Sequence, residues 1–461
     1  MSASAYTAPG APHDRRQELI VPRSFRLAFA IVLLAGASLT RGHAADRPHL
    51  AVAIEAATWI RASAITTSQG LTWPANPLDP STVGASLYSG APGVVLFLLD
   101  LHRATGTASY LADARAGADD LLARVGDMAE SGLYTGIAGV GFTLLETSRV
   151  TRDAKYRDGA ARVVAMLATR ARTVDAGVEW NDTTDIIGGS AGIGLFLLRA
   201  AVDLDDARAR DLAARAGRRL LALGTAAEGG TKWAMTPSFS RLMPNFSHGT
   251  AGVAYFLATL YQATNERAFL DGALAGARYV QAIAKTEGDM CLVFHHEPGD
   301  EGRNLFYLGW CHGPAGTARL WYRLWQATGD TAWLTWARKS ARALLASGIH
   351  DHETAGFWNN VGQCCGSAGV AEFALEMHRA TRDAEYLAFA RTMTKQLLSK
   401  ATRDARGARW IHAENRSDPA KVVAQTGWMQ GAAGVGAWLL RLDAFERGAP
   451  ADLTRLPDSP F

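Results

Sequence analysis

The sequence predicts an all-α protein in which seven helical hairpins close into a ring, with seven buried helices inside seven amphipathic ones. Two observations support this fold. The motif Gly-x-x-Gly followed by an apolar run occurs seven times, and such repeats are typical of repetitive architectures. Between its copies lie more charged segments whose apolar residues recur at steps of three and four, as on one face of a helix. No segment shows a convincing strand alternation.

The helix after each motif is predicted to be buried, because runs such as SGAPGVVLFLLDL and QGAAGVGAWLLRL are apolar nearly all round. Glycine allows a sharp turn and close backbone approach at the start of each helix. In a closed ring the seven turns gather at one end, where helix N-termini favour anions such as thiolates. We therefore expect the chemistry at that mouth. The copies lie 46 to 65 residues apart, and their first glycines are Gly90, Gly136, Gly189, Gly249, Gly313, Gly366 and Gly431.

The one-sided segments are predicted to form the outer ring, since each has a single apolar face to bury. The first lies near residues 49–66 and the last near residues 384–399. A closed ring leaves no internal boundary, so residues 46–461 are predicted to form a single domain.

Residues 1–45 have the order of a secretory signal peptide. Arg23 and Arg26 precede an apolar run from Leu27 to Leu39, and small residues suited to cleavage follow near Ala44. The sequence therefore predicts export to the periplasm or the medium. The alternatives are a membrane anchor, or a cytoplasmic protein whose leader does not function.

Charge argues against a nucleic-acid partner. The formal net charge is +3, and residues 1–45 hold five arginines against two acidic residues. This leaves 42 basic and 42 acidic residues in the rest of the chain, so no basic surface is implied.

Three of the four cysteines stand directly before the glycines of neighbouring hairpins. Cys364 and Cys365 precede Gly366, and Cys311 lies two residues before Gly313. Three thiolates and one open position are typical of a catalytic zinc site. The alternative is a disulfide between Cys311 and one of the pair, which export would favour. Cys291 is out of register and is predicted to be an ordinary buried or surface thiol.

A reactive side chain also precedes the turn of the fourth hairpin. His248 stands immediately before Gly249 in NFSHGTAG, where it is either a catalytic residue or a helix-capping or core histidine. The run His295–Glu297 lacks the second histidine of the H-E-x-x-H zinc motif, so we interpret it as a loop.

Four of these segments resemble motifs of the LanC-like lanthionine synthetases, and the resemblance covers nearly the whole chain after the leader. GWCHGPAG and QCCGSAG resemble the two zinc motifs, NFSHGTAG the active-site histidine motif and TTDIIGGSAG the aspartate motif. The resemblance implies an (α/α) toroid. It also implies zinc as cofactor and the addition of a cysteine thiol across dehydroalanine or dehydrobutyrine to form a thioether.

The resemblance also implies roles for individual residues. Cys311, Cys364 and Cys365 become zinc ligands, His248 the general acid/base and Asp185 its supporting carboxylate. Asp185 would equally suit the N-cap of a helix. Trp310 and His312 are expected to support or line the site.

Two positions depart from the family pattern. The second zinc motif commonly ends Cys-His, whereas this chain has Cys364–Cys365; a subset of the family uses three cysteines. Many members place an arginine four residues before the first zinc cysteine, where this chain has Tyr307. Arg303 lies four residues earlier still.

The sequence thus favours a zinc-dependent thioether-forming enzyme whose partner is a dehydrated peptide or a thiol. The alternatives are addition of a small thiol such as glutathione, or a non-catalytic peptide-binding toroid. A glycosidase would need paired carboxylates, and Asp185 is the single carboxylate in the turn register. We expect a monomer with no stable membrane span once the leader is removed.

Overall fold

The computed structural model describes residues 47–352, 360–412, 422–449 and 452–461. The predicted signal peptide lies outside these ranges, so export remains a prediction. Residues His49–Phe461 form one compact unit. No helix in the described ranges combines the length and the apolar character needed to cross a bilayer.

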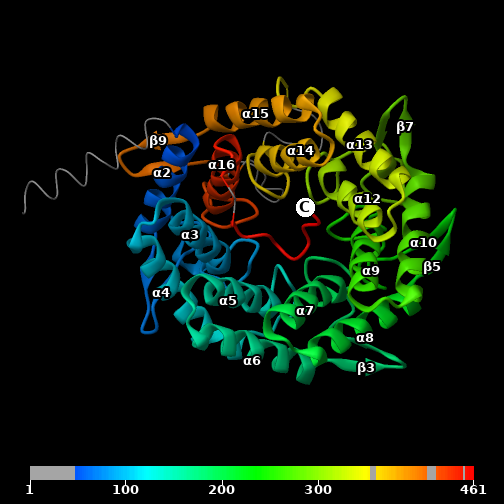
Figure 1. The fold of residues 1–461 in the computed structure, drawn as a ribbon, viewed down its shortest axis with the longest axis horizontal. Helices are drawn as coiled ribbons and strands as arrows, with labels where there is room; N and C mark the ends of the chain where they lie inside the picture. Colours follow the sequence, from blue (N-terminus) through cyan, green and yellow to red (C-terminus); the bar gives the residue numbers. More distant parts are fainter. Residues whose placement is uncertain (1–46, 353–359, 413–421, 450–451) are drawn as a thin grey trace, which may run out of the picture. The chain divides into compact units, whose positions relative to one another are not determined.

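Two concentric rings of helices make up this unit (Figure 1). The inner ring consists of α3 (Ala91–Thr105), α5 (Ile137–Thr151), α7 (Ser190–Leu204), α9 (Thr250–Thr264), α12 (Pro314–Thr328), α14 (Ser367–Thr381) and α16 (Ala432–Glu446). The outer ring consists of α2 (Pro48–Ala62), α4 (Ala108–Arg124), α6 (Ala154–Arg170), α8 (Ala207–Leu223), α10 (Arg267–Ile283), α13 (Thr331–Ala346) and α15 (Ala384–Ser399). Helix α16 packs against α3, which closes the ring. The all-α toroid predicted from the sequence is confirmed.

Each inner helix begins at the residue after the first glycine of a repeat. Close packing explains the glycines. A Cβ on Gly252 would lie 2.1 Å from the backbone oxygen of Phe246, and one on Gly249 only 1.3 Å from that of Met243. The turn before each inner helix therefore folds tightly onto the start of that helix.

The seven turns are also joined to one another by backbone hydrogen bonds that run around the ring. The N–H of Tyr88 donates to Tyr134 O at 3.0 Å, and that of Tyr134 to Ile187 O at 2.9 Å. The circle continues with 2.9 Å bonds from Ser247 N to Cys311 O, Cys364 N to Met429 O and Met429 N to Tyr88 O. Bonds from Ile186 N to Ser247 O and from Trp310 N to Cys364 O complete it. The turns thus gather at one end of the ring, as the sequence predicted.

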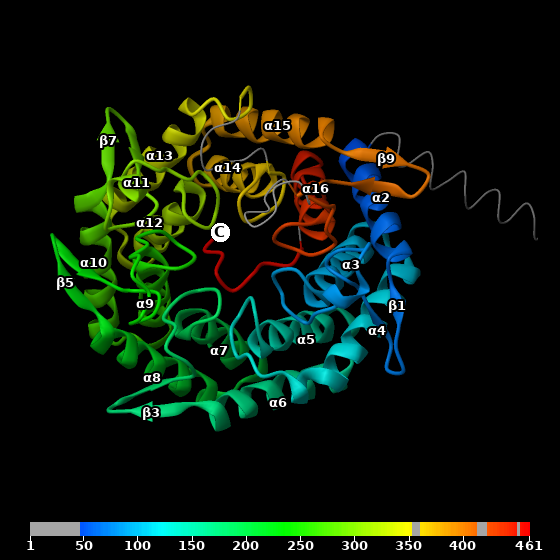
Figure 2. The ribbon, with the colours of Figure 1, turned by 180° about the vertical axis from the view of Figure 1, so that it is seen from behind.

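Short β-hairpins, which the sequence did not predict, follow five of the outer helices. They lie at the outer edge of the unit (Figures 1 and 2). Each pairs two antiparallel strands: β1 (Ile65–Thr66) with β2 (Leu71–Thr72), β3 (Arg172–Val174) with β4 (Gly177–Glu179), β5 (Thr225–Ala227) with β6 (Gly230–Lys232), β7 (Lys285–Glu287) with β8 (Met290–Leu292), and β9 (Thr402–Asp404) with β10 (Gly407–Arg409). Three single-turn helices complete the described elements: η1 (Pro80–Thr82), η2 (Val125–Asp127) and α11 (Asp300–Arg303).

The segment 452–461 enters the centre of the inner ring (Figures 1 and 2). Asp458 is completely buried, and its carboxylate accepts hydrogen bonds from the Tyr134 hydroxyl and the Trp310 indole, both at 3.0 Å. Arg319 of α12 adds an ion pair at 3.2 Å. These contacts connect the segment to Tyr134 and to Trp310, the residue directly before Cys311.

Candidate metal centre and active-site cavity

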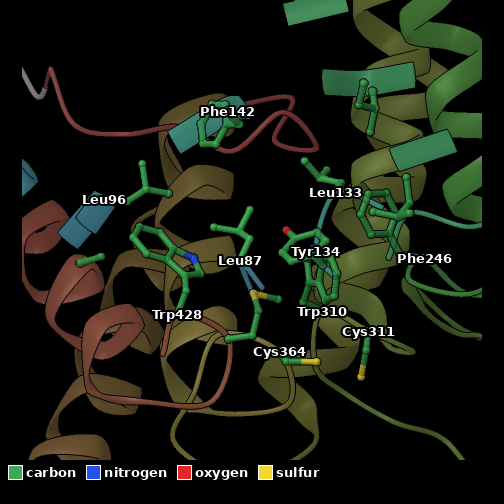
Figure 3. Close-up of a cluster of buried hydrophobic side chains, with 14 of the residues drawn as sticks. Leu87, Leu96, Leu133, Tyr134, Phe142, Phe246, Trp310, Cys311, Cys364 and Trp428 are labelled. Carbon is green, nitrogen blue, oxygen red and sulfur yellow. The ribbon is translucent and has the colours of Figure 1, made fainter. Parts of the chain in front are cut away.

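Three sulfurs meet at the end of the ring where the turns gather. Cys365 Sγ lies 3.1 Å from Cys311 Sγ and 3.3 Å from Cys364 Sγ. All three side chains are buried, and the three sulfurs lie within 4.8 Å of one another. Figure 3 shows Cys311 and Cys364 close to Trp310, and Leu96 and Phe142 on the opposite side of this cluster of buried side chains.

The three sulfurs can hold a metal ion. Tetrahedral zinc binds thiolates at about 2.3 Å, which places neighbouring sulfurs about 3.8 Å apart, so small side-chain movements would suffice. Soft thiolate ligands suit zinc in particular. All four cysteines are free, so the disulfide that the sequence left open is not formed in the structure.

Hydrogen bonds between the thiols shift the pKa values of Cys364 and Cys365 in opposite directions. Bonds from Cys311 and Cys365, with a further one from the Tyr88 hydroxyl, lower the pKa of Cys364 well below its ordinary value. The same bonding and burial raise the pKa of Cys365. Cys364 therefore loses its proton more easily than Cys365 does.

His248 and Asp185 form a hydrogen-bonded pair at the same end of the ring. His248 Nδ1 lies 2.6 Å from Asp185 Oδ2. The other carboxylate oxygen of Asp185 accepts bonds from the N–H groups of Gly188 and Gly189, both at 2.8 Å. The N-cap alternative for Asp185 is wrong, because Gly189 is the N-cap of α7 and no side chain caps that helix. One oxygen of Asp185 instead holds the turn before α7, and the other contacts the imidazole of His248.

A cavity of about 370 Å³ brings these groups together. The three cysteines and His248 share its wall with Trp310 and His312, two residues that we expected at the site from their place in the sequence. The sequence did not predict the remaining lining residues as part of the site: Tyr88, Ile187, Met235, Phe239, Arg241, Met243, Ser247, Gln430 and His295, whose segment was interpreted as a loop.

Some of these residues carried a signal in the sequence. Tyr88 stands two residues before Gly90 and Gln430 one residue before Gly431, the same register as the cysteines. Their positions before these glycines alone could have identified them as candidate site residues. His295 lies in the loop after β8, outside the register, and its ring packs against His312 at a centroid distance of 4.4 Å.

Neither Tyr307 nor Arg303 places a positive charge at the cavity wall. The ring of Tyr307 packs on His295 with centroids 4.2 Å apart. Arg303 donates to Glu297 Oε2 at 2.9 Å and is absent from the cavity wall. Cys291 is buried, and its sulfur lies 3.4 Å from Ser340 Oγ on α13, apart from the other three cysteines.

Comparison with known proteins gives the family. Among solved structures, nisin cyclase matches with a TM-score of 0.60 and 18% identity, over 81% of this chain and 91% of that one. An α-1,6-mannanase of Salegentibacter sp. HEL1_6 matches with a TM-score of 0.48 and 16% identity, over 86% and 99% of the two chains. No curated protein sequence matches. Residues 81–449 match the family described as lanthionine synthetase C-like protein, and the chain therefore belongs to this family.

Proposed function

We propose that this protein is a zinc-dependent thioether-forming enzyme, which adds a cysteine thiol to dehydroalanine or dehydrobutyrine in a peptide. The observation that carries the proposal is one cavity shared by three buried cysteine sulfurs and the His248–Asp185 pair. Membership of the lanthionine synthetase C-like family supports the same reaction.

The metal would be held by Cys311, Cys364 and Cys365. When bound, zinc would supply the Lewis acidity that keeps a substrate thiol deprotonated near neutral pH. The cavity beside these sulfurs gives the substrate thiol its place, and the backbone bonds between the turns keep the three ligands in position.

His248 would move the proton that completes the addition. As the sulfur–carbon bond forms at the β-carbon, the π electrons of the alkene shift toward the α-carbon and its carbonyl. Asp185 occupies Nδ1 of His248, so Nε2 is the atom left to deliver a proton to the α-carbon. The thiol and the alkene are consumed and the thioether forms without a change in total mass.

The peptide partner and the export predicted from residues 1–45 form part of the same proposal. Secretion rests on the sequence of the leader alone. In a periplasmic or secreted location, the substrate would have to be dehydrated before it reaches the cavity.

A peptide bearing one dehydroalanine and one cysteine tests the reaction. Zinc-loaded protein should remove the free thiol at unchanged peptide mass, and a chelator should stop this until zinc is restored. With an added small thiol, a mass gain equal to that thiol would instead indicate intermolecular addition. Binding of the peptide without loss of thiol in either assay would contradict the enzymatic proposal and favour a peptide-binding toroid.

A further inference from the structure

A single arginine lies on the cavity wall. Among the described residues that line it, Arg241 is the one Arg or Lys, and none is Asp or Glu. Arg241 is exposed and makes no hydrogen bond or ion pair with another described residue. Its guanidinium, with five donors in a planar fork, is thus available to a ligand in the cavity.

The loop that carries Arg241 is held at both ends. The N–H of Thr184 donates to Met235 O at 2.9 Å. Near the other end, Leu242 and Glu297 exchange two backbone bonds of 2.7 and 2.9 Å. Residues 235–243, called the rim loop below, are therefore anchored at both ends, so that the part between them has a defined place at the cavity.

Apolar side chains of the rim loop accompany the arginine. Met235, Phe239 and Met243 all line the cavity. Phe239 remains 37% exposed, which is unusual for a phenylalanine in this unit. The rim loop thus offers a binding substrate both an apolar contact and a cation.

The negative charge of the proposed metal centre makes the Arg241 guanidinium important for the binding of acidic substrates. Three thiolates around a divalent ion leave a net charge of −1, which repels a carboxylate that enters the cavity. Arg241 is the one guanidinium on the wall that can offset this repulsion with a bidentate contact, and no lining carboxylate competes for it. A charge-assisted bidentate bond is the geometry that a guanidinium forms with a carboxylate.

We propose that the rim loop is a specificity element that selects peptides carrying a carboxylate beside an apolar side chain, with Arg241 as the carboxylate-binding residue. This inference rests on the proposed function only in taking the cavity as the substrate site. It assigns a substrate class: acidic rather than neutral or basic sequence next to the reacting residues.

Binding of two unreactive peptides tests the inference without turnover. Both contain Leu, carry Ser in place of Cys and Ala in place of dehydroalanine, and differ only in one Asp or Asn beside the Leu. The zinc-loaded wild type should bind the Asp peptide about tenfold more tightly, as expected for a charge-assisted bond that is partly screened by solvent. R241Q should abolish this preference, and raised salt should weaken it.

Two further variants make the result specific. R241K should keep part of the preference, because it retains the charge but not the planar fork. R208Q, at an exposed arginine on α8 outside the cavity, should keep all of it. With the reactive forms of the peptides, R241Q should raise KM for the Asp peptide about tenfold at unchanged kcat.

Equal affinity of the wild type for both peptides, no binding of either, or a preference that survives in R241Q would each overturn the inference. Failure of the proposed reaction looks different: the unreactive Asp peptide would still bind selectively while the reactive one formed no thioether.

Discussion

Single side chains in this site are held by the backbone of the turns. Asp185 shows this most clearly, since Gly188 and Gly189 fix one of its oxygens and leave the other for His248. The imidazole is thereby oriented before any substrate arrives. Preorganised donors of this kind need little rearrangement during the reaction.

H248N should lower the rate of thioether formation by about 10²–10⁴-fold, the usual contribution of a general acid or base. Zinc content should stay unchanged, since His248 is outside the proposed ligand set. Rates would be measured by following free thiol under single-turnover conditions. H102N, at a histidine near the end of α3 and outside the cavity, is the matched control. Equal rates for H248N and wild type would remove His248 from the mechanism.

His412 predicts a dependence of stability on pH. Burial lowers the pKa of this side chain to about 4. Its value in the unfolded chain is about 6.5, so below that pH the unfolded state binds a proton that the folded state does not. Stability should therefore be lost as the pH falls from 6.5 to 4, by about 3 kcal/mol from this group.

Urea unfolding at pH 7.5, 6, 5 and 4 measures this loss. In H412Q the decline over the same interval should be smaller by about the same amount, because glutamine does not titrate. Parallel pH profiles for the two proteins would show that His412 is protonated equally in both states.

The residues missed from the sequence differ in why they were missed. Tyr88 and Gln430 occupy the turn register, yet tyrosine and glutamine there looked unremarkable without metal-ligating chemistry. His295 and Arg241 lie in loops whose path depends on contacts with distant segments, such as the pairing of Leu242 with Glu297. No local pattern encodes such contacts.

At the scale of elements, the repeats sufficed to predict the inner helices. Two features mark the start of each one: the Gly-x-x-Gly turn and the apolar run that follows it. The β-hairpins were missed because their strands are only two or three residues long. Such strands are too short for alternation to be visible. Several are also exposed, as in β7 and β9, so no apolar pattern is required of them.

G252A should destabilise the protein by about 3 kcal/mol, at the upper end for overpacking. The added Cβ would meet the Phe246 oxygen at 2.1 Å, and backbone cannot move aside as a flexible side chain can. G126A is the matched control, because a Cβ there meets nothing within 4 Å. Denaturant unfolding of both variants measures the difference. A G252A protein as stable as G126A would contradict the close approach described for these turns.

At the scale of the whole unit, the circle of backbone bonds explains why residues far apart in sequence form one site. Cys311 and Cys364 belong to different hairpins, yet Trp310 N donates to Cys364 O at 2.8 Å. The register of the repeats predicted that these turns are neighbours. It did not predict that segment 452–461 fills the centre of the ring, because no repeat contains that segment.

Removal of residues 457–461 should destabilise the unit by about 3 kcal/mol or more. Deletion takes away Asp458 and leaves the buried Trp310 indole and Tyr134 hydroxyl without their acceptor, at about 1–3 kcal/mol for each. S459A should stay within about 0.5 kcal/mol of wild type, because the half-buried Ser459 side chain takes no part in the hydrogen bonds of Asp458. Thermal unfolding followed by circular dichroism compares them. Equal stability of the truncated and full chains would show that the hydrogen bonds of Asp458 do not stabilise the unit.

The central claim is that three sulfurs from two neighbouring turns bind one zinc ion, and metal content measured by inductively coupled plasma mass spectrometry tests it most directly. We predict about one zinc per chain in the wild type, strongly reduced content in C311A, C364A and C365A, and unchanged content in C291A, whose sulfur contacts Ser340 instead. A wild type without zinc after refolding in its presence, or a C311A variant that retains the full amount, would contradict the account.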